Sequence, residues 1–290
     1  MISAYGSRRS PAWLAAAGFT AGLCLSAGET RLRLPFDVFP GAVYLALFSL
    51  PALSRGDGPR EGGADFQLGA YLGPAYTPAS DVRLTQPGGT DLLSEGVPWE
   101  GKPFRPPPYY GYRAILWPGS GKLGIMGDFT HIKAVSIKDA KVRKTGMRDG
   151  TAVSAEEPVS ATFKRLEFTH GYNLITANLL RRGEPRGPWL LPYGGVGLGI
   201  AYPHVEMQRA DLPVETRTYE YQVAGPAFQV LGGVEWRFGR RLSLFVEYKL
   251  SCAAIRGDLV GGGVLATDLC THQLPIGIAM HLRPRVAAAP

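Results

Sequence analysis

The sequence is poor in several features that define common protein classes. It has only three cysteines in 290 residues, which excludes a disulfide-dense scaffold. Charged residues make up 19% of the chain, but hydrophobic residues reach 45%, so the chain is not disordered as a whole. No apolar run is long enough to form an uninterrupted membrane-spanning helix. The sequence also has no P-loop, no nucleophile elbow and no zinc-finger spacing.

A glycine-rich segment at residues 194–199 does not indicate dinucleotide binding. Its spacing is wrong for that motif, and no helix is predicted to follow it. The sequence therefore offers no flavin or nicotinamide motif.

Residues 1–64 differ in composition from the rest of the chain. Two apolar runs flank a basic patch, and the second run ends in Ala52-Leu53-Ser54, a small-x-small pattern that suits signal-peptidase cleavage. We interpret residues 1–64 as an export signal region with an extended N-terminus, so the mature chain begins between about residues 55 and 65. An exported chain folds in an oxidising compartment.

After residue 65, apolar and polar residues alternate with the period of a β-strand. From residue 242 to residue 251, leucine, valine and tyrosine occupy the even positions, whereas serine, glutamate and lysine lie at odd positions. Hydrocarbon on one face and charge on the other, over about ten residues, is typical of a transmembrane β-strand. Eight such segments are predicted, at 66–76, 109–118, 122–132, 165–181, 189–204, 219–238, 241–255 and 268–282.

The predicted fold is all-β, an eight-stranded antiparallel transmembrane β-barrel of the outer-membrane type. It occupies residues 65–283, and a short C-terminal tail, 284–290, follows it. The connections alternate strictly in length, as they do in outer-membrane barrels with short periplasmic turns and long extracellular loops. The long ones are 77–108, 133–164, 205–218 and 256–267, and the short ones are 119–121, 182–188 and 239–240. We therefore expect the chain in the outer membrane of a Gram-negative bacterium.

A soluble lipocalin-like barrel, whose apolar face points inward, is the alternative architecture. Four charged residues on the polar face argue against it, and we expect them to form interior ion pairs: Arg113, Asp128, Glu247 and Lys249. A small-solute channel is a third possibility, but an eight-stranded barrel is normally filled by side chains.

Aromatic residues and glycines support the barrel. Trp117, Trp189 and Trp236 lie beside short turns, where an interfacial aromatic girdle is expected. The glycines of one strand are predicted to face inward and leave room for larger side chains opposite: Gly195, Gly197 and Gly199.

Polar clusters scattered along the sequence meet on the extracellular rim of this barrel. Four of the five histidines are there: His131, His170, His204 and His272. His204-x-Glu206 places two ligand-type side chains on one side of an extended segment, and His131 could complete a set suited to iron, zinc or copper. A hydrogen-bonded pair on a polar rim is the simpler interpretation of His204 and Glu206.

The positive charge of the chain indicates an anionic partner. The net charge is +7 and the isoelectric point is about 9.4. The second long loop is especially basic, with Lys133, Lys138, Lys141, Arg143, Lys144, Arg148 and Lys164. Outside an outer membrane these side chains face lipopolysaccharide phosphates, and nucleic acid is not an expected partner.

Two cysteines near the end of the chain are predicted to meet. Cys252 and Cys270 are each nine residues from Gly261, so a hairpin centred there places them directly opposite each other and within disulfide range. A one-residue bulge near the glycines would separate them.

Several short motifs, found together, carry a family resemblance. They are Trp99-Glu100-Gly101-Lys102, Pro107-Pro108-Tyr109-Tyr110-Gly111, Phe129-Thr130-His131, Leu166-Glu167-Phe168-Thr169, Pro203-His204-Val205-Glu206, Tyr219-Glu220-Tyr221-Gln222-Val223 and Gly261-Gly262-Gly263. The chain, over roughly residues 66–282, resembles the lipid A oxidase family of outer-membrane barrels. The resemblance implies O₂-dependent oxidation of the proximal glucosamine of lipid A to 2-aminogluconate. The chain departs from the family in its long N-terminal region and in a tail that continues past Leu282 instead of ending on an aromatic residue.

The resemblance and the rim together suggest a set of site residues. The expected catalytic residues are Glu100, His131, His204 and Glu206, of which the last three are also the expected metal ligands. The expected substrate-binding residues are Trp99, Lys102, Arg105, Tyr109, Tyr110 and Glu220, with rings stacking on the sugar and cations holding a phosphate or carboxylate. A divalent or transition metal ion is the expected cofactor, and O₂ is the expected electron acceptor. The expected partner of this monomeric barrel is lipid A of the outer leaflet. The rival hypothesis is a non-enzymatic barrel that binds lipopolysaccharide or stabilises the envelope.

Overall fold

The computed structural model describes residues 64–282, apart from 104, 120–121, 188 and 239–240. The predicted export region up to residue 63 and the predicted tail 284–290 lie outside the described residues. No helix in the described part of the chain is long and apolar enough to cross a membrane.

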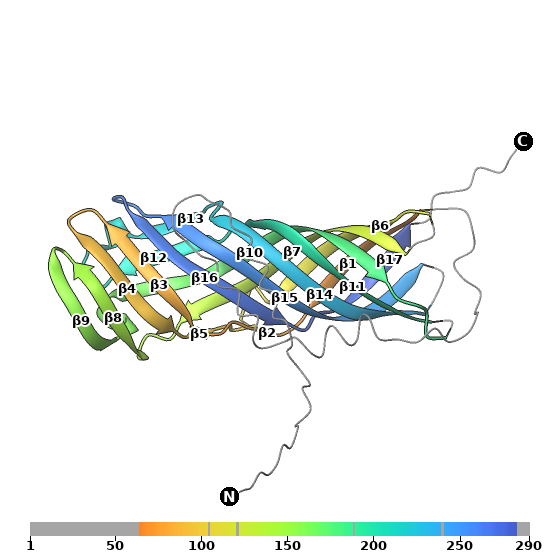
Figure 1. Ribbon diagram of the computed structural model, residues 1–290, viewed down its shortest axis with the longest axis horizontal. Helices are drawn as coiled ribbons and strands as arrows, with labels where there is room; N and C mark the ends of the chain where they lie inside the picture. Colours follow the sequence, from red (N-terminus) through yellow and green to blue (C-terminus); the bar gives the residue numbers. More distant parts are fainter. Residues whose placement is uncertain (1–63, 104, 120–121, 188, 239–240, 283–290) are drawn as a thin grey trace, which may run out of the picture. The chain divides into compact units, whose positions relative to one another are not determined.

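The described chain forms one sheet of 17 strands, all of them paired antiparallel (Figure 1). Eight of these strands pair in an order that returns to its start, β1–β6–β7–β10–β11–β14–β15–β17–β1. They are β1 (Asp65–Leu72), β6 (Tyr110–Trp117), β7 (Leu123–Ser136), β10 (Phe163–Arg182), β11 (Leu190–Ala201), β14 (Gly225–Arg237), β15 (Leu242–Asp258) and β17 (Ile276–Leu282). Each of the eight predicted segments contributes to one of these strands.

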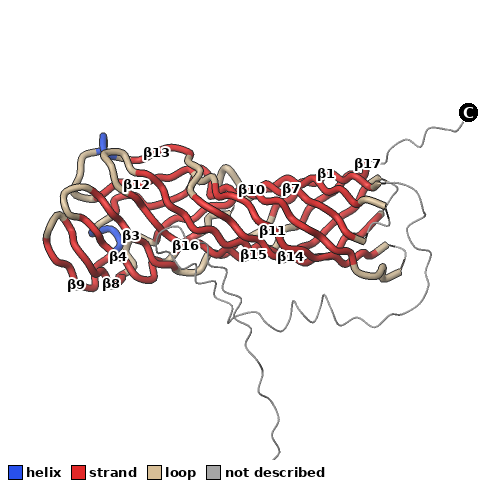
Figure 2. Tube along the Cα trace, turned by 45° about the horizontal axis from the view of Figure 1, so that its top comes forward, coloured by secondary structure: helices blue, strands red, loops and turns tan. Residues whose placement is uncertain are grey.

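The predicted long loops are largely strands. They supply β3 (Ser80–Gln86), β4 (Thr90–Val97), β5 (Trp99–Glu100), β8 (Lys141–Arg148), β9 (Thr151–Pro158) and β12 (His204–Arg209), and part of β16 (Val264–Gln273). Figure 2 shows strand in most of the described chain, with the short 3₁₀-helices Val159–Ala161 and Val214–Thr216 between strands. These strands form because, together with the beginning of β10, they enclose an apolar cluster, which includes Val82, Val142, Phe163, Leu166 and Met207.

Four of the predicted strands are interrupted. In the predicted strand 189–204, Tyr202-Pro203 separates β11 from β12, which begins at His204. Gly73-Pro74 separates β1 from β2 (Ala75–Tyr76), and Leu274-Pro275 separates β16 from β17. Proline has no N–H to donate to the ladder, so the strands end beside it. The predicted strand 219–238 is divided into β13 (Thr218–Tyr221) and β14.

The eight strands carry apolar side chains on their exposed outer face and polar side chains on their buried inner face. On β11, Val196, Leu198 and Ile200 are 50%, 66% and 40% exposed. On the inner face, Arg113 and Lys249 are buried. This distribution is that of an outer-membrane barrel and the reverse of a lipocalin-like barrel.

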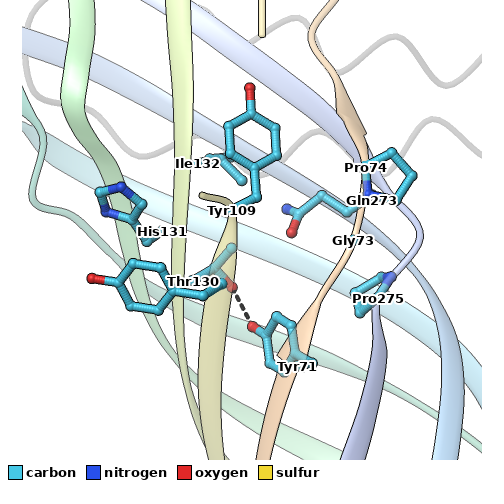
Figure 3. A pocket seen from close by; sticks show the side chains of 10 residues that line it. Tyr71, Gly73, Pro74, Tyr109, Thr130, His131, Ile132, Gln273 and Pro275 are labelled. Carbon is cyan, nitrogen blue, oxygen red and sulfur yellow. Dashed lines mark hydrogen bonds between the residues drawn. The ribbon is translucent and has the colours of Figure 1, made fainter. Parts of the chain in front are cut away.

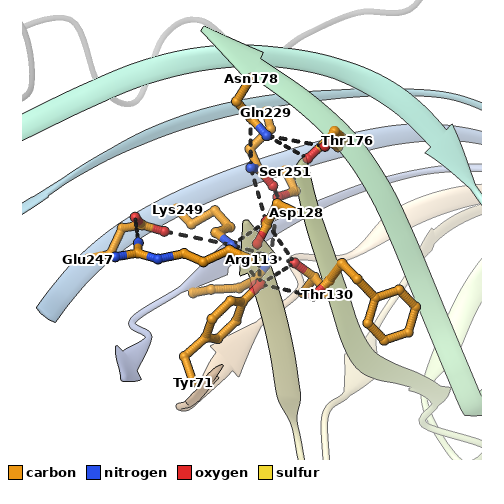
Figure 4. Close-up of polar contacts among 12 residues, drawn as sticks. Tyr71, Arg113, Asp128, Thr130, Thr176, Asn178, Gln229, Glu247, Lys249 and Ser251 are labelled. Carbon is orange, nitrogen blue, oxygen red and sulfur yellow. Dashed lines mark hydrogen bonds and ion pairs between the residues drawn. The ribbon is translucent and has the colours of Figure 1, made fainter. Parts of the chain in front are cut away.

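The four predicted interior charges form two buried ion pairs (Figure 4). Arg113 Nη1 lies 3.0 Å from Glu247 Oε2, and Lys249 Nζ lies 2.6 Å from Asp128 Oδ2. The Tyr71 hydroxyl donates to Asp128, 2.9 Å away. The prediction of interior ion pairs is therefore confirmed.

The predicted tryptophan girdle is only partly correct. Trp189 and Trp236 are exposed, but Trp117 is 1% exposed and packs against the guanidinium of Arg182, 3.9 Å from its ring. Trp117 has the same parity as Arg113 along β6, so the alternation itself directs it inward. All three tryptophans belong to the same end of the sheet, because Trp117 pairs with Asp65 and Asp65 binds Arg237, next to Trp236.

We expect Gly199→Ala to destabilise the sheet by about 1–3 kcal/mol, because overpacking forces neighbouring groups to move. A Cβ atom there would lie 1.9 Å from the Ile175 carbonyl oxygen, a backbone atom that cannot rotate away. Gly232→Ala is the matched control, since its nearest neighbour is 3.9 Å away. Urea unfolding in detergent measures both variants. Equal stabilities would show that strand β11 can tolerate side chains at this position.

The predicted cysteine pair is confirmed. Cys252 and Cys270 lie directly opposite each other on β15 and β16, with their Cα atoms 4.0 Å apart, and they form a disulfide. No bulge separates the pair, because the register stays constant from Lys249 to Asp258.

Candidate functional site

Three side chains of the kinds that bind metal ions lie close together in the structure: His170 of β10, and His204 and Glu206 of β12. One potential ligand atom from each residue lies within 4.8 Å of those of the other two. Glu206 is fully buried and His204 is 6% exposed, whereas His170 is exposed. We call these residues the His170–His204–Glu206 group.

A β-bulge in β10 delivers His170 to this group. Phe168 pairs with Ala134 and Tyr172 pairs with Ile132, so three residues of β10 face the single residue Lys133 of β7. The extra residues include His170 and Thr169, and both donate hydrogen bonds to Glu206 Oε1. Bulges re-aim side chains in this way beside functional sites.

The two carboxylate oxygens of Glu206 have different partners. Oε2 accepts hydrogen bonds from Arg165 at 2.9 Å and Arg217 at 3.2 Å. Oε1 faces Thr169 and the two imidazoles. Burial opposes ionisation, but these hydrogen bonds outweigh it and hold the pKa of Glu206 below its ordinary value. Glu206 is thus a carboxylate, oriented on one side by arginines and open to the histidines on the other.

His204 is suited to act as a neutral ligand. Burial lowers the pKa of its imidazole, because the charged form is poorly solvated there. Its Nδ1 lies 3.3 Å from Glu206 Oε1, but this buried atom has no partner with hydrogen-bond geometry. The rings of Tyr219 and Tyr221 pack against the imidazole at 4.4 and 4.7 Å.

The group lies on the outer face of the sheet. Val205 and Met207 belong to the apolar cluster inside, so the alternating neighbours His204 and Glu206 point outward. Tyr202 and Tyr221, whose rings stack 5.5 Å apart, are exposed beside them. His204 follows the exposed Ile200 by four residues, no more than about 13 Å along an extended chain. The group therefore lies just beyond the exposed apolar rows.

His131 is not a member of the group, although the sequence suggested it as a ligand. It lies on β7, where its Nδ1 is 2.8 Å from Asn173 Oδ1 and its ring stacks on Tyr110 at 4.7 Å. Because Asn173 presents an oxygen, Nδ1 carries the proton and Nε2 keeps a free lone pair. Nε2 is buried without a hydrogen-bond partner. The structure brings His170 to the group instead.

Two of the predicted substrate-stacking rings are buried, which excludes them as a sugar platform in this structure. Trp99 and Tyr109 are 6% and 3% exposed and belong to the inner apolar cluster. The Trp99 indole donates to Ser80, and the Tyr109 hydroxyl donates to the Lys133 carbonyl. Phe104 lies outside the described residues.

The other predicted substrate residues are accessible. Arg105, Glu100 and Glu220 are exposed, and Lys102 and Tyr110 are half-buried. Lys102 Nζ lies 3.3 Å from Glu100 Oε2, and Glu220 accepts a hydrogen bond from Gln222 at 2.9 Å.

The cavity in Figure 3, lined by Tyr71, Tyr109, Thr130, His131 and Gln273 among others, has a volume of about 10 Å³. That is the space of one water molecule. Tyr109 and Tyr71 point to one side of the strands in this view, and His131 points to the other (Figure 3).

Only some of these residues could be predicted from the sequence. His170 was among the rim histidines, but the bulge that turns it toward Glu206 has no local signature. Arg165 and Arg217 were not singled out, because their role depends on strand pairing across β10, β12 and β13.

No protein-family model matches this sequence, and no curated protein matches it. Among solved structures, Neisserial surface protein A (NspA) is similar at 13% identity and a TM-score of 0.34, over 77% of this chain and 99% of NspA. The outer membrane protein OprG from Pseudomonas aeruginosa is similar at 10% identity and a TM-score of 0.37, over 77% and 97% of the two chains. Ail, the attachment invasion locus protein of Yersinia pestis, solved in complex with the heparin analogue sucrose octasulfate, is similar at 10% identity and a TM-score of 0.31, over 76% and 99%. Such low scores carry no argument about function. The outer-membrane location agrees with this chain's own exposed apolar rows and polar inner face.

Proposed function

We propose that the eight strands of the cyclic pairing order form a closed barrel in the outer membrane. Closure removes every sheet edge, which a strand in hydrocarbon requires. The exposed apolar rows on β1, β6, β7, β10, β11, β14, β15 and β17 contact lipid. The strands beyond them project from the outer leaflet and carry the His170–His204–Glu206 group.

The activity that we propose is O₂-dependent oxidation of the proximal glucosamine of lipid A to 2-aminogluconate. The observation that carries it is the His170–His204–Glu206 group, a His/His/carboxylate set on the outer wall just beyond the lipid-facing rows. A glycolipid headgroup of the outer leaflet lies at that height, so it can reach the group from the side.

The residues present fit a metal ion. Two imidazoles and a carboxylate, with Nδ1 of His204 unpaired, are a donor set typical of iron, copper or zinc. When bound, a redox-active ion of this kind would supply a route for electrons from the sugar to O₂. Arg165 and Arg217 donate to Glu206 Oε2 and would thereby hold the carboxylate in its ligating orientation.

The remaining chemistry is a proton transfer and a two-electron oxidation. The anomeric carbon loses its hydrogen and the anomeric hydroxyl loses its proton, which gives a lactone, while O₂ takes up two electrons and two protons to become hydrogen peroxide. Water then opens the lactone to the acid. We assign the proton at the hydroxyl to Nε2 of His131, which has a free lone pair. The exposed rings of Tyr202 and Tyr221 provide a stacking surface for the sugar.

Mass spectrometry of lipid A tests this function. In cells that express this chain, we expect the proximal unit to be heavier by one oxygen atom, because the ring hemiacetal becomes a carboxylic acid. The gain should require O₂ and a free anomeric hydroxyl. Cells that carry an empty vector are the control. Unchanged lipid A, with the barrel folded in the membrane, would contradict the proposed oxidation.

The alternative is a non-enzymatic barrel that binds lipopolysaccharide. Exposed basic side chains on the projecting strands favour it, among them Lys138, Lys141 and Arg143. It predicts lipopolysaccharide binding that survives every substitution in the His170–His204–Glu206 group, with no change in lipid A.

A further inference from the structure

Lys133 is a buried cation without a counter-ion. Its side chain is on the face of β7 that also carries His131, and the residue is only 4% exposed. Its ammonium donates to the Arg105 carbonyl at 2.7 Å, which is a neutral partner. In the described part of the chain, neither Lys133 nor Arg105 forms an ion pair with a carboxylate. A buried charge is normally paired, so this arrangement calls for an anion.

Two more cations surround Lys133. Burial lowers the pKa of Lys133, and the positive charges of Arg105 and Lys102 lower it further. Two acids lie opposite Val135, next to this cluster. Glu100 is exposed and pairs with Lys102 at 3.3 Å, whereas Glu167 pairs with Arg165 at 2.9 Å. Because Glu167 is neutralised by Arg165, three cations share the one carboxylate of Glu100, which leaves an excess of positive charge. We call Lys102, Arg105 and Lys133 the Lys133 cluster.

The Lys133 cluster adjoins the His170–His204–Glu206 group. Lys133 faces the bulge of β10 that contains His170, and His131, two residues away on the same face of β7, stacks on Tyr110. A molecule with an anion on the cluster would therefore extend across Tyr110 and His131 toward the imidazoles. The cluster opens on the same outer wall as the group.

We infer that the Lys133 cluster is an oxyanion-binding subsite, which holds a phosphate or carboxylate on the saccharide headgroup of an outer-leaflet glycolipid. The inference rests on the proposed function for the identity of the glycolipid, but the subsite binds whether or not oxidation follows. Lys133 is the buried cation of the three, so an anion bound here would stabilise it most. Lys102 and Arg105 supply donors at its entrance.

The test is binding of lipopolysaccharide to the full chain in detergent, with metal removed by chelation. We expect Lys133→Met to weaken binding about tenfold, the usual effect of losing a hydrogen bond to a charged group. Lys133→Arg should retain most of the affinity, because it keeps the charge. Lys122→Met, which removes an exposed lysine beside the short turn before β7, should bind like the parent. Heat-modifiable migration on gels confirms that each variant has folded.

The lipopolysaccharide is used both intact and enzymatically dephosphorylated. If dephosphorylation removes the difference between Lys133→Met and the parent, the subsite holds a phosphate. If the difference persists and Lys133→Arg restores binding, the subsite holds a sugar carboxylate. Equal affinity of Lys133→Met and the parent for intact lipopolysaccharide overturns the inference.

The outcome also separates this inference from the proposed function. If Lys133→Met loses binding but the parent forms no oxidised lipid A, the subsite is supported and the oxidation is rejected. If the parent forms oxidised lipid A but Lys133→Met binds normally, the oxidation is supported and the subsite is rejected.

Discussion

Replacing His170 with alanine is expected to reduce the formation of oxidised lipid A at least about a hundredfold, while the barrel still folds. His170 donates to Glu206 and is one of the three residues that could hold a metal ion. Removing one ligand from such a set disrupts both metal affinity and the orientation of the remaining ligands. His170 is exposed, so its loss creates no cavity in the apolar cluster.

The matched control is His272→Ala, a histidine of the same rim that lies on β16 and packs against Tyr76 and Tyr248. We expect it to oxidise lipid A like the parent. Mass spectrometry of lipid A measures the product, and metal analysis of the purified chain measures the bound ion. Parental activity in His170→Ala would exclude the His170–His204–Glu206 group from catalysis. If both variants fold but neither oxidises lipid A, the activity depends on the rim as a whole and not specifically on this group.

Asp128→Asn is expected to lower the free energy of unfolding by about 3–5 kcal/mol. The substitution keeps the shape of the side chain but leaves the Lys249 ammonium, which is fully buried, without its nearest carboxylate. Glu247 lies 3.7 Å from Lys249, but it already pairs with Arg113. Breaking a buried pair is costly because the remaining charge is neither solvated nor neutralised.

Asp91→Asn makes the same chemical change in an exposed pair. The side chains of Arg83 and Asp91 are 61% and 47% exposed, and their loss should cost less than about 1 kcal/mol. The double variant Asp128→Asn with Lys249→Met should recover part of the stability, because it removes the unpaired charge. Urea unfolding in detergent measures all three. If Asp128→Asn is as stable as Asp91→Asn, the inner ion pairs do not support the barrel.

The residues within one strand were largely predictable. Alternation with period 2 depends only on neighbouring residues, and it located the eight strands of the cyclic pairing order and the polar inner face. The interior charges at Arg113, Asp128, Glu247 and Lys249 followed from the same parity. The Cys252–Cys270 pair was predictable because a single hairpin, centred on three glycines, fixes its register.

The candidate site was predicted less completely, and two pairs of residues show why. His204 and Glu206 lie two apart on one strand, so their common face follows from the sequence. Trp99 and Tyr109 look like a stacking platform in a proline-rich segment, yet both rings pack into the inner apolar cluster. Whether an aromatic ring is exposed or buried depends on which segments pack over it, and those segments can be far away in the sequence.

The sequence by itself determined the class of fold, the inner and outer faces of the strands, the ion pairs between them and the hairpin that joins the two cysteines. Only the tertiary structure decided that the long loops are strands around a second apolar cluster, that His170 and not His131 joins His204 and Glu206, and that Lys133 is a buried cation beside them. The reason is physical. Parity along a strand is set by backbone geometry within a few residues, whereas a β-bulge, a strand partner and the solvation of a charge are set by segments far apart in the chain.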